Sequence, residues 1–461
     1  MIALTFCGGA GTVTGSKHWL QAGDENLLVD CGLFQGLKDL RLRNWADPPF
    51  DPRTIQHVLL THAHIDHSGW LPRLGRLGFA GDVWCTPPTL DLVRIMLADA
   101  AHLQEEDAEF LNRKGLSKHS PALPLYDHRD AEQVVRRVRT QPYARWFDLS
   151  PAFRVRFRDA GHLLGSAMVD VVARDGGREV KFLFSGDVGR YDMPLAADPD
   201  APGEPDVMLV ESTYGDRKHP PGAALEALEP VLRRMLDRRA VLLVPAFAVG
   251  RAQQIMYLAQ QLIQARRLPE FPIYVDSPMA VDATAIYRRY PELHGVPAAE
   301  LQAEKRALYG PNVHLCRSVQ DSKRLNGMRG PALLLSSSGM LAGGRVLHHL
   351  TWILPDPNQL VALVGYQAAG TRGRALQDGA PALRIHGQDV PVRAEVVDLG
   401  HLSGHADQDE LQRWLAPVQV PPGRVFVTHG EPQAAAALVS TLRQTRGWNA
   451  SAPQLGERVE L

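Results

Sequence analysis

The sequence predicts an α/β protein in which a β-rich domain is interrupted by an inserted domain with a parallel sheet. Residues 1–210 consist mostly of short strand-like runs joined by turns, with few helical patterns. From 211 to 393 helical and strand patterns alternate, which is typical of a parallel sheet with helices on both faces. Residues 394–461 return to the style of the first part. We therefore expect the two ends of the chain to form one domain and residues 211–393 to form a second.

Length and composition limit the class of protein. A chain of 461 residues is too long for one ordinary core and should fold into two or three domains. Hydrophobic residues make up 45% of it and charged residues 22%, which are the proportions of a globular protein. The formal net charge is -1, so there is no overall positive field to attract a polyanion. A polyanionic substrate would have to be bound by a local basic groove.

The cysteines and the hydropathy pattern indicate a cytoplasmic protein. The four cysteines are far apart and form no Cys-x-x-Cys pair, which fits a reducing compartment. They are Cys7, Cys31, Cys85 and Cys316. The first residues lack the basic leader of a signal peptide. The longest apolar runs, such as 241–249, are far shorter than the ~20 residues that span a bilayer, so we expect no membrane partner.

Short apolar runs bounded by small or polar residues predict the strands of the first domain. They are expected at 2–6, 27–30, 56–60, 153–157, 168–173 and 180–184. Residues 89–112 carry apolar side chains at helical spacing with acidic residues between them, which predicts an amphipathic helix. The strand ends carry small and polar residues, and such positions often hold functional side chains.

In the inserted domain, apolar runs and amphipathic stretches follow one another regularly. Helices are expected near 223–239, 251–267, 280–290 and 343–354, and strands at 241–245, 273–276, 313–316, 332–335 and 360–364. In the last part of the chain we expect strands at 394–399 and 424–428 and helices at 408–416 and 432–446.

The stretch from Thr61 to Gly69 has the densest cluster of potential metal ligands in the sequence. His62, His64, Asp66 and His67 follow directly after an apolar strand-like run. Imidazole nitrogen and carboxylate oxygen both suit zinc. His62 and His64 are two residues apart, so on an extended segment they point to the same side. Asp66 and His67 fall where the chain should turn into a helix, so this stretch can begin two metal sites.

Further ligands for a two-metal site should come from other strand ends. Three candidates lie after an apolar run or beside a glycine: His162, Asp187 and His429. Each one alone could be a helix-capping histidine or a turn aspartate. Together with the 61–69 stretch they complete a two-metal set.

These motifs, taken in order, resemble a known family. The pattern His62-x-His64-x-Asp66-His67, followed by His162 and Asp187, resembles the metallo-β-lactamase superfamily. The stretches 211–216 (Glu-Ser-Thr-Tyr-Gly-Asp), 402–407 and 428–430 narrow the resemblance to its β-CASP branch, which contains the pre-mRNA 3′-end cleavage factor and bacterial RNase J. The resemblance covers nearly the whole chain and implies an αββα sandwich with an inserted parallel α/β β-CASP domain as a lid over the metals.

The resemblance also implies a role for each residue of the motifs. It implies that His62, His64 and His162 hold one zinc ion, that Asp66, His67 and His429 hold a second, and that Asp187 bridges the two. Asp30 would orient a ligand histidine without binding metal itself. Glu211 would orient His405, which would protonate the leaving oxygen. We count Asp66 with Glu211 and His405 as catalytic.

The activity implied by the family is hydrolysis of RNA by a hydroxide that two zinc ions activate. Zinc can lower the pKa of bound water to roughly 7. The histidine at position 429 is retained in the RNA-processing members of the family, so we expect RNA, in single-stranded form, as the partner. Helix N-termini of the insert suit phosphate, although simple helix capping explains them equally well. Ser337, Ser338, Arg345 and Arg251 are our candidates for substrate binding, and Arg372 and Arg374 are further basic candidates for the cleft.

Three other functions stay open at this point. The chain has no room for the extra C-terminal domain of RNase J, which favours an endonuclease over a 5′ exoribonuclease. A metal-dependent hydrolase of a small ester, lactam or thioester would not need so large an insert. An RNA-binding scaffold without catalysis would have lost ligands, whereas every ligand position is filled. Gly404 stands where alanine is common in the family, a small departure.

Overall fold

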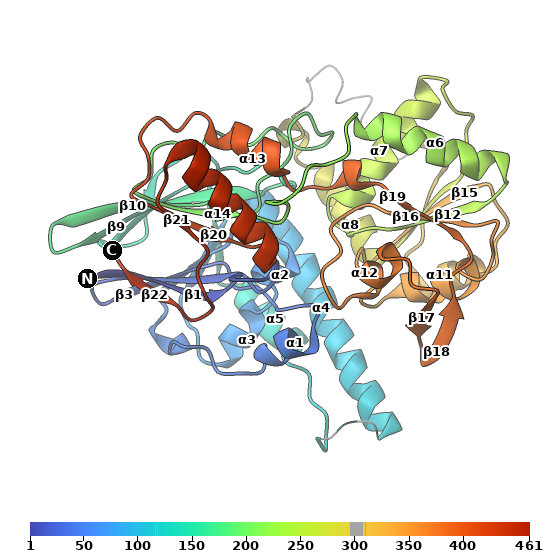
Figure 1. Ribbon diagram of the computed structural model, residues 1–461. Coiled ribbons are helices and arrows are strands. Elements are labelled where there is room, and N and C mark those ends of the chain that lie inside the picture. Colours follow the sequence, from blue (N-terminus) through green and yellow to red (C-terminus); the bar gives the residue numbers. More distant parts are fainter. Residues whose placement is uncertain (116, 118, 296–307, 309) are drawn as a thin grey trace. The chain divides into compact units, whose positions relative to one another are not determined.

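The computed structural model describes residues 1–115, 117, 119–295, 308 and 310–461, and the chain divides into two compact units. Unit 1 consists of Met1–Tyr191, Asp198–Lys218 and His405–Leu461. Unit 2 consists of Asp192–Ala197 and His219–Gly404. One unit is therefore inserted within the other, and each has its own sheets and helices (Figure 1).

Unit 1 is built on two seven-stranded sheets. The first sheet has the order β22-β1-β2-β3-β4-β5-β6, with bounds Arg458–Glu460, Ile2–Gly8, Lys17–Ala22, Glu25–Val29, His57–Leu59, Asp82–Cys85 and Val138–Thr140. The second has the order β21-β20-β11-β10-β9-β8-β7, with bounds Ala450–Ser451, Arg424–Thr428, Val207–Glu211, Arg178–Phe184, Ala167–Asp175, Phe153–Asp159 and Phe147–Asp148.

Helices cover the outer faces of both sheets, so unit 1 has four layers (Figure 1). One side carries α13 (Gln408–Leu415) and α14 (Pro432–Arg446); the other carries α1 (Lys38–Arg43), α2 (Ile65–Ser68), α3 (Leu71–Arg76), α4 (Pro87–Lys114) and α5 (His128–Val135). The core between the sheets contains Phe6, Phe157, Phe184 and Phe426, all buried. This is the αββα sandwich that the resemblance to the metallo-β-lactamase superfamily implies.

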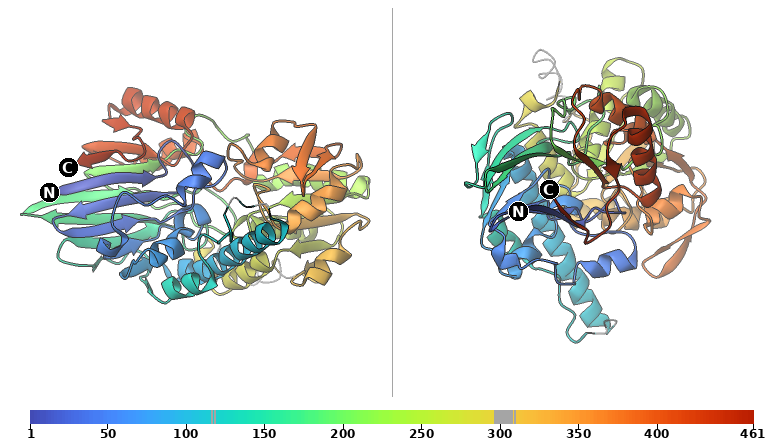
Figure 2. Two further views of the ribbon diagram at one scale, coloured as in Figure 1. Left: turned by 90° about the horizontal axis from the view of Figure 1, so that it is seen from below. Right: turned by 60° about the vertical axis from the view of Figure 1, so that its left-hand side comes forward.

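Strand pairing in unit 1 joins segments that are far apart in the sequence. The two chain ends lie side by side because β1 pairs with β22, which places Ala3 opposite Glu460 (Figure 2). In the second sheet β11 runs parallel between β10 and β20. The register of β11 and β20 places Glu211 opposite Thr428, so the residues that follow these two strands emerge together at one sheet edge.

Unit 2 is built on a six-stranded sheet with the order β14-β13-β15-β12-β16-β19. Its strands span Val313–Leu315, Ile273–Asp276, Ala332–Ser336, Val241–Pro245, Leu360–Leu363 and Glu395–Asp398, and every pair in it is parallel, as predicted. The helices are α6 (Ala224–Asp237), α7 (Arg251–Gln264), α8 (Pro278–Tyr287), α10 (Val319–Arg324), α11 (Arg345–Ile353) and α12 (Arg372–Gln377), with a hairpin of β17 (Ala382–Ile385) and β18 (Gln388–Pro391). None of the helices described in either unit is both long enough and apolar enough to cross a membrane.

The unit boundaries in the structure differ from the predicted boundaries at 211 and 394. Residues 211–218 lie in unit 1, because Glu211 is the last residue of β11 in the second sheet. Residues 394–404 lie in unit 2, because β19 pairs with β16 of the parallel sheet. The partner of a strand decides to which unit the strand belongs, and the sequence of the strand itself does not specify that partner.

Lys17 is a buried cation in unit 1, and its titration should change the stability of the protein. Its side chain donates to the carbonyl oxygen of Gly32 at 2.5 Å and lies over the rings of Phe34 and Trp70. Burial lowers the pKa of Lys17 to about 8. Between this value and the ordinary value of 10.5, Lys17 binds a proton in the unfolded chain but not in the folded protein. The free energy of unfolding therefore rises with pH across that window.

We expect the free energy of unfolding of the wild type to rise by about 2 kcal/mol, relative to Lys17→Met, between pH 7 and pH 10. Urea unfolding of both proteins at several pH values measures this difference. Equal pH dependence in the two proteins would contradict the prediction. Because the variant also loses the bond to Gly32, only the change with pH is diagnostic, and the absolute difference at one pH is not.

Candidate metal centre

The predicted ligands of unit 1 come from loops at the ends of strands in both sheets. In the first sheet, β4 leads into the segment that carries His62 and His64, and α2 follows at once with Asp66 and His67. In the second sheet, His162 follows β8, Asp187 follows β10 and His429 follows β20. All seven side chains meet in two adjoining clusters within unit 1.

The first cluster consists of His62, His64, His162 and Asp187. The Nδ1 atom of His64 lies 3.1 Å from Nε2 of His62 and 3.3 Å from Nε2 of His162. Oδ2 of Asp187 lies 3.4 Å from Nε2 of His62. Ligand atoms of a tetrahedral zinc site, each 2.0–2.1 Å from the metal, would be about 3.3 Å apart. The spacing of this cluster therefore fits a metal ion at its centre.

The second cluster consists of Asp66, His67 and His429, and Asp187 also reaches it. The Nε2 atoms of His67 and His429 face each other at 3.1 Å, and Oδ2 of Asp66 lies 3.6 Å from Nε2 of His429. Oδ1 of Asp187 lies 3.2 Å from Nε2 of His67. Asp187 thus directs one carboxylate oxygen toward each cluster, as a bridging ligand would.

The hydrogen bonds on the far side of the rings test whether a cation fits the second cluster. In His67 the Nδ1 atom donates to Asp30 at 2.7 Å, and in His429 it faces the hydroxyl of Thr213 at 3.2 Å. In the neutral rings, the two Nε2 lone pairs then face each other. Two lone pairs at this distance repel unless a positive charge, either a proton or a metal ion, lies between them. The arrangement fits a metal ion.

The electrostatics of the buried groups favour the same conclusion. Burial lowers the pKa of His64 to about 4 and the pKa of His62 well below its usual value, so both rings are neutral, the form that binds metal. Burial alone would lower the pKa of His67, but the carboxylates of Asp187 and Asp30 outweigh it and hold that pKa well above its usual value. Burial alone would raise the pKa of Asp187, yet the surrounding imidazoles hold it well below its usual range. The centre attracts positive charge.

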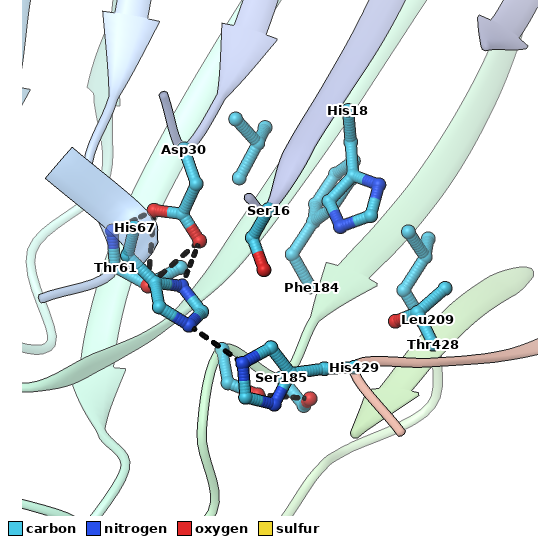
Figure 3. Close-up of a pocket in the computed structure, with 12 residues that line it drawn as sticks. Ser16, His18, Asp30, Thr61, His67, Phe184, Ser185, Leu209, Thr428 and His429 are labelled. Carbon is cyan, nitrogen blue, oxygen red and sulfur yellow. Dashed lines mark hydrogen bonds and ion pairs between the residues drawn. The ribbon is translucent and has the colours of Figure 1, made fainter. Parts of the chain in front are cut away.

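Asp30 and Thr61 fix the ligand loop from behind (Figure 3). Asp30 accepts hydrogen bonds from the backbone and hydroxyl of Thr61 and from Nδ1 of His67. The Thr61 hydroxyl in turn lies 3.0 Å from Nδ1 of His62. Asp30 therefore contacts a predicted ligand and stands outside both clusters, and the orienting role that the resemblance implies stays a prediction. Sequence reasoning missed Thr61, although its place between a strand and the first histidine could have drawn attention to it.

Glu211 and His405 form a hydrogen-bonded pair beside the clusters. Oε1 of Glu211 lies 3.1 Å from Nδ1 of His405 and accepts from the backbone of Val188, and Oε2 accepts from the backbone of Thr213. Glu211 is fully buried, whereas the side chain of His405 is 15% exposed. Burial would lower the pKa of His405, but the carboxylates of Glu211 and Asp187 outweigh it and raise the pKa.

His405 could alternatively contribute to a metal group with Asp187 and His429. Its Nδ1 atom, however, is 3.9 Å from Asp187 and 3.1 Å from Glu211, so this nitrogen is committed to Glu211. The ring of His405 lies against that of His162, with 4.5 Å between the ring centroids. The pair therefore stands next to the ligands without replacing any of them.

The predicted substrate-binding residues all lie in unit 2, and their arginines have internal partners. Arg345 donates to Asp276 at 2.8 Å and to the carbonyl oxygens of Cys316 and Arg317. Arg251 donates to Gln254 and to the carbonyl oxygen of Leu402. These contacts hold loops of unit 2 together, so a substrate contact by either guanidinium stays a prediction.

The other candidates of unit 2 are placed as follows. The Ser337 hydroxyl lies 3.1 Å from that of Ser277, and the Ser338 hydroxyl accepts from the backbone of Ala342. Arg372 donates to the carbonyl oxygen of Arg384, and Arg374 pairs with Asp378. Ser337 and Ser338 directly follow β15. They lie at the carboxyl end of an inner strand of the sheet, and their role stays a prediction.

Comparison with known proteins identifies the family. The family models that match are the metallo-beta-lactamase superfamily over residues 15–246, the Beta-Casp domain over 252–376, and the Zn-dependent metallo-hydrolase RNA specificity domain over 389–453. A protein of Thermus thermophilus named Ribonuclease TTHA0252 is 40% identical over 98% of both chains. Transcription termination factor FttA of Pyrococcus abyssi is 32% identical over the whole of this chain and 71% of its own.

A solved structure of a protein of unknown function from Enterococcus faecalis shares the fold, with a TM-score of 0.51 at 13% identity over the whole of both chains. The two sequence matches, which cover nearly the whole of this chain, and the three domain matches agree with the motif series and with the architecture. The chain belongs to the metallo-β-lactamase superfamily and, within it, to the β-CASP branch.

Proposed function

We propose that this protein is a zinc-dependent ribonuclease that hydrolyses phosphodiester bonds of single-stranded RNA, and that it cleaves within the chain. The observation that carries the proposal is the buried Glu211–His405 pair next to two ligand clusters that share Asp187. Further support comes from the ribonuclease named above, which is similar over almost its full length, and from the match to an RNA specificity domain.

In this proposal two zinc ions are held by the two clusters. His62, His64 and His162 would hold one, Asp66, His67 and His429 the other, and Asp187 would contribute to both. Bound zinc would supply a hydroxide nucleophile near neutral pH and neutralise phosphate charge. The chain itself supplies the histidine imidazoles and the carboxylates of Asp66 and Asp187, and buried hydrogen-bond partners behind the rings keep the imidazoles oriented.

His405 would supply the proton that the leaving 3′ oxygen needs. Its Nδ1 faces Glu211, which leaves Nε2 as the nitrogen that gives up a proton. The buried carboxylate of Glu211 favours the charged imidazolium of His405 and fixes its ring plane through their hydrogen bond. The other carboxylate oxygen of Glu211 accepts from the backbone of Thr213. A positioned general acid typically contributes about 10²–10⁴-fold to rate. We place this activity in the cytoplasm, where the four free and buried cysteines would stay reduced.

The test compares substrates of different classes with metal-loaded protein. We expect cleavage of a labelled single-stranded RNA, with little or no cleavage of DNA of the same sequence or of a chromogenic lactam. A circular RNA without ends separates the two modes, since only an endonuclease can open it. The Asp187→Asn variant, purified in parallel, controls for contaminating nuclease.

Each outcome decides between the functions. Intact RNA after incubation with zinc-loaded protein would overturn the ribonuclease proposal and favour the scaffold. Turnover of the lactam alone would favour the small-molecule hydrolase. Cleavage of linear RNA together with an intact circle would overturn the endonuclease assignment in favour of a 5′ exoribonuclease.

A further inference from the structure

Three of the ligand histidines are held from behind by a partner for their Nδ1 atom, and the partners differ in strength. His67 donates to the carboxylate of Asp30 at 2.7 Å, whereas His62 and His429 face the hydroxyls of Thr61 and Thr213 at 3.0 and 3.2 Å. Such partners fix the tautomer and the orientation of a metal-binding imidazole. The longest of these three contacts belongs to His429.

Thr213 is placed by the strand that ends in Glu211. The register of β11 and β20 sets Glu211 opposite Thr428, so Thr213 and His429 leave the same sheet edge side by side. Thr213 is 1% exposed. Its hydroxyl donates to the carbonyl oxygen of His429 at 3.3 Å, which leaves an oxygen lone pair for Nδ1–H of the same residue. One hydroxyl thus contacts both the backbone and the ring of His429.

The backbone of His429 is already fixed, so the rotation of its ring is the freedom that remains. His429 has a φ of 47°, in the left-handed region, and its N–H donates to the carbonyl oxygen of Gly9 at 2.6 Å. A second acceptor competes with Thr213 for Nδ1–H of His429, because Oδ1 of Asp187 lies 3.4 Å from that nitrogen. If Nδ1–H turned to Asp187, it would occupy an oxygen that the second cluster uses.

We propose that Thr213 is a positioning residue for the metal centre: its hydroxyl takes Nδ1–H of His429, which keeps Nε2 directed at Asp66 and His67 and leaves Asp187 available as a ligand. The inference rests on the proposal that the two clusters bind metal, and it does not depend on RNA being the substrate. Thr213 touches neither cluster centre and acts through His429.

The test is a zinc titration of metal-free protein against a chromophoric chelator. In Thr213→Val, which keeps the shape and removes the hydroxyl, we expect the affinity for one equivalent of zinc to fall about 10–100-fold. The affinity for the other equivalent should be unchanged. Thr213→Ser keeps the hydroxyl and should restore wild-type binding of both.

A matched control comes from Thr5 on β1, which is also buried and whose hydroxyl has no hydrogen-bond partner among the described residues. Thr5→Val should bind both equivalents as the wild type does. The proposal is overturned if Thr213→Val binds both equivalents with wild-type affinity, or if Thr213→Ser is as weak as the valine variant. Because the zinc titration uses no RNA, its result does not depend on the outcome of the ribonuclease assay.

Discussion

Replacing His405 with alanine is expected to lower kcat on RNA by about 10²–10⁴-fold, the usual contribution of a general acid, while both equivalents of zinc stay bound. The reason is that Nδ1 of His405 lies 3.1 Å from Glu211, and each of the two clusters has its own set of predicted ligands that does not include His405. Initial rates under saturating RNA and elemental analysis of the same samples measure the two quantities.

A substrate with a good leaving group makes the His405 experiment specific for acid catalysis. Bis(p-nitrophenyl) phosphate releases a stable phenolate that needs no proton, so His405→Ala should turn it over at a rate close to that of the wild type. Equal losses on both substrates would contradict the acid role. Loss of one zinc equivalent would instead show that His405 binds metal with Asp187 and His429, the alternative grouping in this centre.

Replacing Asp187 with asparagine should have the larger effect on metal content. Its Oδ2 lies 3.4 Å from Nε2 of His62 and its Oδ1 lies 3.2 Å from Nε2 of His67, so both clusters lose a shared anionic ligand. An amide keeps the volume but offers one oxygen and no charge. We expect less than one equivalent of zinc after gel filtration and RNA cleavage below detection.

The matched control for Asp187 is Asp148→Asn, since the Asp148 side chain is 68% exposed on β7 and pairs loosely with Arg154. It should retain both zinc equivalents and full activity. Two equivalents of tightly bound zinc in Asp187→Asn would refute the bridging role. Thermal unfolding of the metal-free proteins should give similar midpoints, which separates ligand loss from misfolding.

Much of the centre could be predicted because its ligands are local or stand at strand ends. His62, His64, Asp66 and His67 lie within six residues, so their proximity needs no tertiary information. His162, Asp187 and His429 were recognisable because each follows an apolar run or lies beside a glycine. Alternating patterns also predicted the parallel sheet of unit 2, since a strand buried on both faces reads as a continuous apolar run.

Contacts between distant residues needed the tertiary structure or the resemblance to a known family. Glu211 and His405 are 194 residues apart, and Asp30 and His67 are 37 apart. Hydrophobic periodicity tells which face of a strand is buried, but it carries no information about which strands are neighbours. The same limit explains why the predicted boundary at 394 differs from the unit boundary in the structure: the partner of β19 is β16, which lies in unit 2.

The sequence by itself therefore determined the ligand types, their grouping around the 61–69 stretch and the presence of an insert, because these depend on residue identity and short spacing. Only the tertiary structure decided which side chains are committed elsewhere. Arg345 is predicted to bind phosphate because it stands at a helix start, and only the structure shows that it also donates to Asp276 and to two carbonyl oxygens. Nothing in the local sequence distinguishes Thr61 and Thr213 from other threonines. The structure places their hydroxyls 3.0 and 3.2 Å from the Nδ1 atoms of two predicted ligand histidines. Hydrogen-bond partners are set by packing across strands, which no local pattern specifies.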